Sequence, residues 1–210
     1  MKSALFIILI SYPLALTAQD EDKSLYVFIG EKIEVTKFTP DVSPKDSSAT
    51  LIIMDNAFKA RYKVIDWVHN RIDTDTIEFE AYDHYGTPGF SHYQHVLLYL
   101  VKEEGKLYHA KYQYNALFKT KEGRWASPWT NYDYAHPYNE KTSIKPVKID
   151  FVSRASIDIS KYTQKQIKES FPKSYYIRSG NQVMPTYGNY IEELFKLKRE
   201  GVLKARGYFN

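Results

Sequence analysis

The stretch VLLYLVKEEGKLYHAKYQYNALF, residues 96–118, decides the fold. Its first six residues are continuously apolar, as in a central strand that is covered on both faces. Residues 102–106 then predict a turn, because Gly105 can adopt the positive φ that tight hairpins need. The following strand, residues 107–118, alternates, and it is predicted to place six residues on one face: Tyr108, Ala110, Tyr112, Tyr114, Ala116 and Phe118. A second turn at Gly123 extends the prediction to a three-stranded antiparallel meander over residues 96–126.

Other segments also predict strands. Residues 58–64 and 76–82 alternate between apolar and polar side chains, which is typical of strands with one buried face. Residues 25–30 and 32–38 predict two short strands around a turn, and residues 145–152 predict a further strand. Residues 39–48, which are rich in Pro and Ser, predict a surface loop, and residues 129–146 predict a long irregular connection.

Two helices are predicted near the C-terminus. Thr163 and Gln166 have the spacing of a capping box, and Pro172 ends the helix that follows. Asn189 begins the second helix and Gly201 ends it. The predicted fold class is therefore α+β and mostly antiparallel β, with the sheet curled into a sandwich or open barrel and covered by two C-terminal helices. An outer-membrane β-barrel is the alternative, but a capped helix near the C-terminus occupies the place of its closing strand.

The N-terminus has the pattern of a signal peptide, and we expect residues 1–18 to be removed. Lys2 precedes the apolar run of residues 4–10, Pro13 interrupts it, and Ala18 provides a small residue at the cleavage point. An uncleaved membrane anchor is the alternative, although about 18 uninterrupted apolar residues would be needed to span a bilayer. Residues 19–210 are predicted to form a single β-rich domain whose C-terminal part, from about residue 160, is helical. The chain contains no Cys and no Asn-x-Ser/Thr acceptor. These features favour a bacterial periplasmic or secreted protein with no transmembrane span after cleavage.

Charge is distributed unevenly along the chain. Residues 141–210 contain 14 basic and 6 acidic residues, whereas residues 19–140 contain 14 basic and 19 acidic residues. The basic C-terminal run contains Lys196, Lys198, Arg199, Lys204 and Arg206. Nucleic acid is one partner for such a run, but a solvated helix face explains the same residues, and we expect no nucleic acid as partner.

Three histidines lie close together in the sequence: His84, His92 and His95. The loop that carries them, residues 83–95, is longer than a hairpin requires, and long loops between strands often carry function. Imidazoles and a neighbouring carboxylate are ligands for zinc or another divalent metal. The sequence therefore leaves open a metal-dependent hydrolase as the alternative function. Common catalytic motifs are absent from the sequence, which favours a protein that is not an enzyme without deciding the matter.

Aromatic residues are the strongest unusual signal, with 19 Tyr, 11 Phe and 3 Trp. They concentrate in residues 124–138, and Tyr and Trp suit contact surfaces and the faces of sugar rings. The predicted binding residues are Tyr85, Phe90, Trp125, Trp129, Tyr132 and Tyr134. The function that follows is an exported, non-catalytic binding or structural protein of the bacterial envelope, which contacts a glycan or an envelope protein. Packing of the same rings over the sheet as lids is the competing interpretation.

Overall fold

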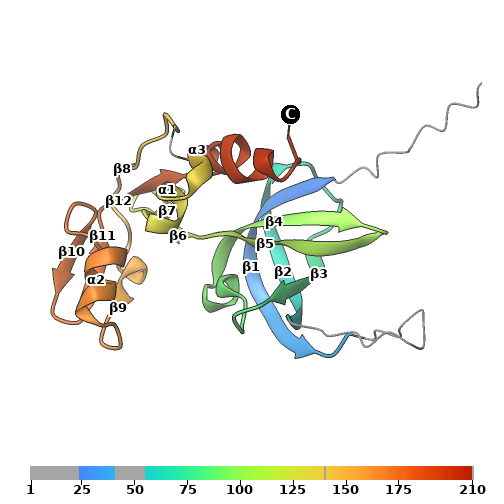
Figure 1. Ribbon diagram of the computed structural model, residues 1–210, viewed down its shortest axis with the longest axis horizontal. Helices are drawn as coiled ribbons and strands as arrows, with labels where there is room; N and C mark the ends of the chain where they lie inside the picture. The colour runs from blue at the N-terminus through green and yellow to red at the C-terminus, as the bar shows by residue number, and fades with distance from the viewer. Residues whose placement is uncertain (1–23, 41–54, 140, 210) are drawn as a thin grey trace, which may run out of the picture.

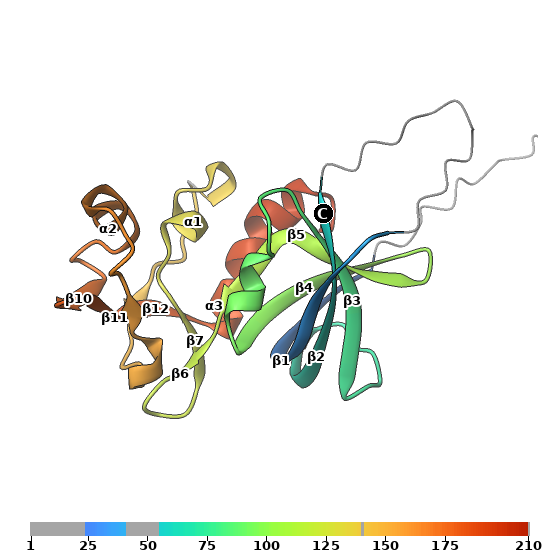
Figure 2. The same ribbon diagram turned by 90° about the horizontal axis from the view of Figure 1, so that it is seen from below.

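The structure is a computed structural model that describes residues 24–40, 55–139 and 141–209. The predicted signal peptide and most of the predicted loop over residues 39–48 lie outside these residues. Figure 1 shows a β-barrel on one side and a second part, residues 118–190, on the other, with the C-terminal helix against the barrel. Figure 2 shows the same separation after a quarter turn. Within the described ranges, no helix is long and apolar enough to cross a membrane.

Five strands close the barrel, in the order β1-β2-β3-β5-β4. They are β1 (Leu25–Phe38), β2 (Asn56–His69), β3 (Thr76–Asp83), β4 (His95–Glu103) and β5 (Lys106–Ala116). β4 returns to pair with β1, and β3 meets β5 in parallel, so the sheet is mixed, although most of its pairs are antiparallel. This is the Greek-key order of a five-stranded barrel of the OB type. The predicted β-rich fold class is confirmed, and closure leaves the barrel without free edges.

The first strand differs from its prediction, because residues 25–38 form one strand and not two around a turn. Register shifts between Ile29 and Gly30 and between Lys32 and Glu34 bend β1, so that it pairs with β4 at its beginning and with β2 along most of its length. Gly30 is required at the bend. A Cβ there would lie 2.9 Å from the Phe28 ring and 3.0 Å from the Tyr62 ring.

β5 contains the irregularity that matters most for the surface. Leu100 pairs with His109 and Leu98 pairs with Tyr114, so Tyr99 alone faces residues 110–113. Tyr112 adopts φ 67°, a conformation that is rare for a bulky residue. The bulge reverses the two faces of the strand. Ala110 packs in the cluster outside the barrel, whereas Tyr114 packs in the cluster inside it, so the prediction that they share a face is wrong.

The second part contains two small sheets. The first has the order β6-β7-β12-β8 and consists of β6 (Phe118–Lys119), β7 (Trp125–Pro128), β12 (Tyr187–Tyr190) and β8 (Val147–Lys148). The second consists of β10 (Tyr176–Ser179), β11 (Gln182–Pro185) and β9 (Ile157–Asp158). The antiparallel turn at Gly123 is confirmed, since β6 pairs with β7. The prediction of a third strand in the meander is nevertheless wrong, because β6 and β7 belong to a different sheet from β4 and β5.

Short helices complete the second part. They are α1 (Asn131–Tyr134), α2 (Gln164–Ser170) and the 3-10 turns Pro137–Asn139 and Ser153–Ala155; a further 3-10 turn, Gly89–His92, precedes β4 in the barrel. The predicted capping box of α2 is confirmed. Thr163 Oγ1 accepts a hydrogen bond from the Gln166 backbone N–H, and Gln166 Oε1 accepts one from the Thr163 backbone N–H.

The C-terminal helix, α3 (Ile191–Lys198), begins two residues after the predicted Asn189, with Tyr190 as its N-cap, and covers the outer face of β4 and β5. The regular helix is interrupted at Gly201 as predicted, since the backbone of this glycine is non-helical (φ −103°, ψ −109°), and a short helical turn follows the kink. A Cβ at Gly201 would collide with the Asn139 side chain. Gly201 therefore allows the second part to approach the helix closely.

Candidate functional site

Two of the predicted binding residues belong to the hydrophobic interior. Phe90 is fully buried inside the barrel, where its ring contacts Tyr62 and Phe79. Trp129 is buried in the second part and stacks on Tyr175, with ring centroids 4.4 Å apart. Neither ring is available to a ligand in this conformation, so their interpretation as surface contacts is wrong. The apolar areas of the two rings are buried by their neighbours, as the lid interpretation expected.

Trp125 and Tyr134 are partly buried. The Trp125 ring packs on the His95 imidazole at 4.7 Å, and Lys119 Nζ lies 3.9 Å from the centre of the indole ring. The Tyr134 hydroxyl donates a hydrogen bond to Asn189 Oδ1. Burial raises the pKa of this hydroxyl, with a smaller contribution from Asp133. Both side chains therefore join structural elements, and each leaves only part of its ring exposed.

The three histidines do not converge. His84 Nδ1 lies 3.4 Å from Asp55 Oδ1, whereas His95 Nε2 lies 3.8 Å from Glu31 Oε1. His92 is exposed in the 3-10 turn that precedes β4. Over residues 24–40, 55–139 and 141–209, no group of three or more His, Cys, Asp or Glu side chains could hold a metal ion. The geometry thus gives no support to the metal-dependent hydrolase.

A row of aromatic side chains crosses from the barrel to the second part. We call it the aromatic ladder, and its members are His84, Tyr85, Tyr112, Tyr132, His136 and Tyr138. Centroid distances between successive rings are 5.3 Å for His84–Tyr85, 6.0 Å for Tyr85–Tyr112, 6.1 Å for Tyr132–His136 and 5.0 Å for His136–Tyr138. Between Tyr112 and Tyr132 the connection is a hydrogen bond of 3.5 Å, which the Tyr132 hydroxyl donates to the Tyr112 carbonyl.

The ladder is open to solvent at both ends and near its middle. Tyr85 is 87% exposed, Tyr132 51% and Tyr138 58%. Apolar groups that are exposed singly are normal on a protein surface, whereas a contiguous exposed patch marks an interaction surface. The ladder contains two groups of three contacting rings, and the hydrogen bond between Tyr132 and the Tyr112 carbonyl joins them. The bulge in β5 gives the ladder its connection, because it brings the Tyr112 carbonyl to the Tyr132 hydroxyl.

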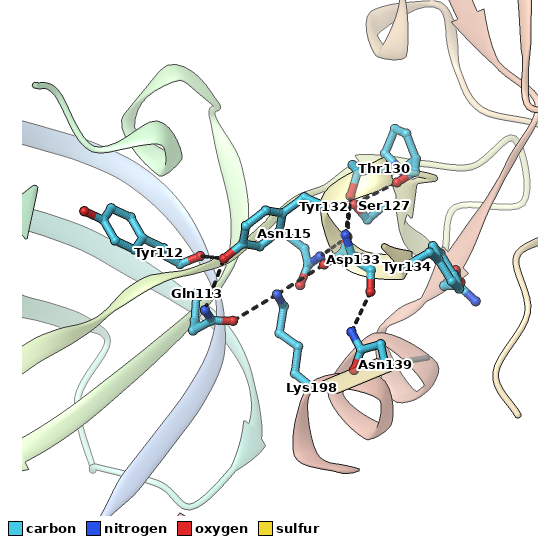
Figure 3. Close-up of polar contacts among 12 residues, drawn as sticks. Tyr112, Gln113, Asn115, Ser127, Thr130, Tyr132, Asp133, Tyr134, Asn139 and Lys198 are labelled. Carbon is cyan, nitrogen blue, oxygen red and sulfur yellow. Dashed lines mark hydrogen bonds and ion pairs between the residues drawn. The ribbon is translucent and has the colours of Figure 1, made fainter. Parts of the chain in front are cut away.

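A buried polar network fixes the place where the ladder crosses between the two parts (Figure 3). Lys198 of α3 donates from Nζ to Asp133 Oδ1 and to Gln113 Oε1, each at 3.2 Å, and its side chain is 3% exposed. Asp133 belongs to α1 and Gln113 to β5. The ammonium group therefore joins three elements that lie far apart in the sequence.

Neighbouring side chains complete the network. Asn115 Nδ2 donates to Asp133 Oδ2 at 3.1 Å, and Thr130 Oγ1 donates to the same oxygen at 2.7 Å. Gln113 Nε2 lies 3.4 Å from the Tyr132 hydroxyl, so the network contacts the ladder directly. A charge removed from water is costly unless it is paired and hydrogen-bonded. Two oxygen partners for Lys198 and three donors for Asp133 provide this compensation.

At the barrel end of the ladder lies a second charged cluster. Asp55 accepts a hydrogen bond from Lys111, and its other carboxylate oxygen lies 3.4 Å from His84 Nδ1. The hydrogen bond with Lys111 lowers the pKa of Asp55 and raises the pKa of Lys111. Lys111 Nζ lies 5.4 Å from the centre of the Tyr112 ring. The cluster therefore holds Tyr112 beside a fixed positive charge, and His84 connects it to Tyr85.

An open groove of about 490 Å³ lies elsewhere on the barrel, over β1, β2, β3 and the β4–β5 turn. Its charged lining residues are Glu34, Lys59, Arg61, Glu78, Glu80 and Lys106. Arg61 pairs with Glu34 at 3.6 Å. Three glutamates against three cations give no net positive field for a nucleic-acid backbone, and the groove contains none of the ladder residues.

Comparison with known proteins gave no match to any protein-family model, curated protein or solved structure. The proposal of a function therefore rests on the geometry of this chain.

Sequence reasoning identified part of the site. It placed Tyr85 and Tyr132 among the binding residues, and both are exposed members of the ladder. It missed Tyr112, because the alternation of β5 gave no sign of the bulge. It also placed Lys198 on a solvated helix face, which is wrong. The signal that could have found the buried pair was the position of Lys198, one residue after the apolar Leu197 and four after Leu194.

Proposed function

We propose that the protein is an exported, non-catalytic glycan-binding protein whose contact surface is the aromatic ladder. The observation that carries the proposal is the row from His84 to Tyr138, in which two groups of three rings are joined by the Tyr132–Tyr112 hydrogen bond across the two parts of the molecule. Tyr and His rings combine an apolar face with polar edges, and a sugar presents the same combination to them. Export is supported by the sequence of residues 1–18.

The composition of the ladder favours a glycan over a protein partner. The fully buried centre of a protein interface is more apolar than the surrounding surface. None of the exposed aliphatic residues of the described chain, namely Ile33, Ile65, Val147 and Ile177, belongs to the ladder. A row of rings with hydroxyl and imidazole edges can stack on a polar ligand, but it offers no aliphatic centre for a folded partner.

The test is a glycan array followed by calorimetry on the glycans that are retained. We expect Tyr85→Ala and Tyr138→Ala each to weaken binding by about tenfold, because each removes one exposed aromatic contact. The matched control is Tyr162→Ala, since Tyr162 is 40% exposed but packs on Phe171 outside the ladder. If no glycan is retained while a cell-extract protein binds in a Tyr85-dependent manner, the ladder serves a protein partner and the proposal fails.

A further inference from the structure

Arg206 lies beside the ladder and lacks a carboxylate partner. Its Nη1 donates a 3.0 Å hydrogen bond to the Lys111 carbonyl, directly before Tyr112 in the chain. The side chain is exposed, and this is its one hydrogen bond within the described residues. No carboxylate of the part of the chain that the structure describes forms an ion pair with it. The bond to the bulge therefore anchors the guanidinium group and leaves its other N–H groups facing solvent.

The other cations of this region are compensated. Lys111 is paired with Asp55, and Lys198 is paired with Asp133. Arg206 is thus the cation next to the middle of the ladder whose charge is not balanced by a neighbour in the described chain.

Guanidinium groups bind carboxylate and other oxyanions through paired N–H donors, and anchoring reduces the entropy lost on binding. We propose that Arg206 forms an anionic subsite of the ladder, so that the ligand is an acidic glycan whose sugar units carry carboxylate or sulfate groups. The inference rests on the proposed function, because the ladder supplies the stacking contacts on either side of the subsite. The acidic group lies next to Tyr112, and the rings of the sugar units extend towards Tyr85 and Tyr132.

The basic character of the C-terminal residues agrees with this assignment. Residues 141–210 carry 14 basic against 6 acidic residues, and Lys204 is exposed at the end of the last helical turn, two residues before Arg206. Such a field raises the local concentration of anionic ligands. The subsite itself depends on the anchored guanidinium group of Arg206. A general electrostatic attraction by the C-terminal residues would not depend on this one side chain.

The experiment compares oligogalacturonate with its methyl ester, which keeps the rings and removes the charge, and a sulfated oligosaccharide with its desulfated form. We expect the acidic member of at least one pair to bind the full-length protein about tenfold more tightly than its neutral form, since a hydrogen bond to a charged group adds about that factor. Arg206→Gln should abolish this preference. Lys204→Gln is the matched control and should preserve it.

The outcomes separate the two proposals. Equal affinity for acidic and neutral forms, or a preference that survives Arg206→Gln, overturns the anionic subsite. Equal loss in Arg206→Gln and Lys204→Gln also overturns it, because a general field would then explain the preference. In each of these cases, if Tyr85→Ala weakens the binding of both the acidic and the neutral form, the ladder is still the binding surface. If neither form nor any arrayed glycan binds, the proposed function itself fails.

Discussion

The barrel and the second part of the chain hold their aromatic side chains in different ways. In the barrel, Tyr62, Phe79 and Phe90 contact one another with centroid distances of 5.8–6.0 Å, between strands of 8–14 residues. In the second part the strands contain two to four residues, and the Trp129 ring stacks between Tyr134 and Tyr175. There the Tyr176 hydroxyl donates a hydrogen bond to the Trp129 carbonyl.

The difference shows how each part is stabilised. Long strands in a closed ring satisfy most backbone groups within the sheet, so the barrel interior can be almost wholly apolar. Short strands leave more backbone groups to be satisfied by side chains, and the second part uses Tyr, Asn, Thr and Asp for this purpose. The aromatic ladder lies where the two arrangements meet, and the polar network between them holds it in place.

The largest expected effect comes from removing a buried ring. Phe90→Ala in the barrel and Trp129→Ala in the second part should each lower the free energy of unfolding by about 3–5 kcal/mol. The two variants should also differ in which part of the molecule they destabilise. Phe90→Ala should destabilise the whole molecule, whereas Trp129→Ala should loosen the second part first. Chemical denaturation combined with hydrogen exchange measures both, and uniform loss of protection in Trp129→Ala would show that the two parts unfold as one unit.

Next in size is the buried ion pair between Lys198 and Asp133. Lys198→Met leaves the Asp133 carboxylate without its cation, and breaking such a pair costs about 3–5 kcal/mol. The double variant Lys198→Met with Asp133→Asn removes both charges, so it should recover part of this loss. Urea unfolding of the single and double variants provides the measurement. Equal stability of Lys198→Met and the unchanged protein would mean that the network contributes nothing to holding the two parts together.

Lowering the pH should reduce the free energy of unfolding, because His109 in the barrel becomes protonated more readily in the unfolded chain. Burial lowers the pKa of His109 to about 4, while its Nε2 lies 2.9 Å from the Gln113 carbonyl. The unfolded chain takes up this proton near pH 6.5, and the folded chain does not until about pH 4. The contribution of His109, up to about 3 kcal/mol, is therefore complete above pH 6.5 and is lost as the pH falls towards 4.

Burial also lowers the pKa values of His69 and His95, so both histidines add to the loss of stability at low pH. His109→Gln should flatten the stability profile between pH 6.5 and pH 4, since Gln can still donate to the Gln113 carbonyl and does not titrate. The profile is obtained from urea midpoints at a series of pH values. An unchanged slope in His109→Gln would assign the acid sensitivity to the other two histidines.

The smallest expected effect on stability belongs to the ladder. Tyr85→Ala should change the free energy of unfolding by less than about 0.5 kcal/mol, because its side chain is 87% exposed. Tyr132→Ala should cost more, about 1 kcal/mol, since its hydroxyl bonds to the Tyr112 carbonyl. Thermal melts of the two variants test the order, and a reversed order would place Tyr85 against the core.

Local sequence patterns predicted much of the barrel. Alternation located β2 and β3, the apolar run located β4, and the turn at Gly105 joined it to β5 as expected. The remaining features depend on contacts between distant residues. Gly30 bends β1 because Phe28 and Tyr62 pack against it, and the bulge before Tyr114 depends on its pairing with Leu98.

The site was harder to predict for the same reason. Tyr85 is exposed and Phe90 is buried, although five positions in one loop separate them. An aromatic residue in a loop has no periodic pattern that shows which way it points. The pairing of Lys198 with Asp133 joins positions 65 residues apart, so it follows from the docking of α3 on α1 and β5.

The pairing of β7 with β12 has a consequence for protein engineering. The chain leaves the barrel through Ala126 and returns beside it through Tyr190, because these two residues are partners in the same sheet. The two ends of the segment between them are therefore neighbours, the geometry in which insertions are best tolerated. A short linker from Pro128 to Gly188, also partners, would excise the intervening residues and join the entry and exit strands as a hairpin. Because the excised residues include Asp133, Lys198→Met would be needed as well, so that no unpaired ammonium group remains. The same junction would accept a foreign module in their place.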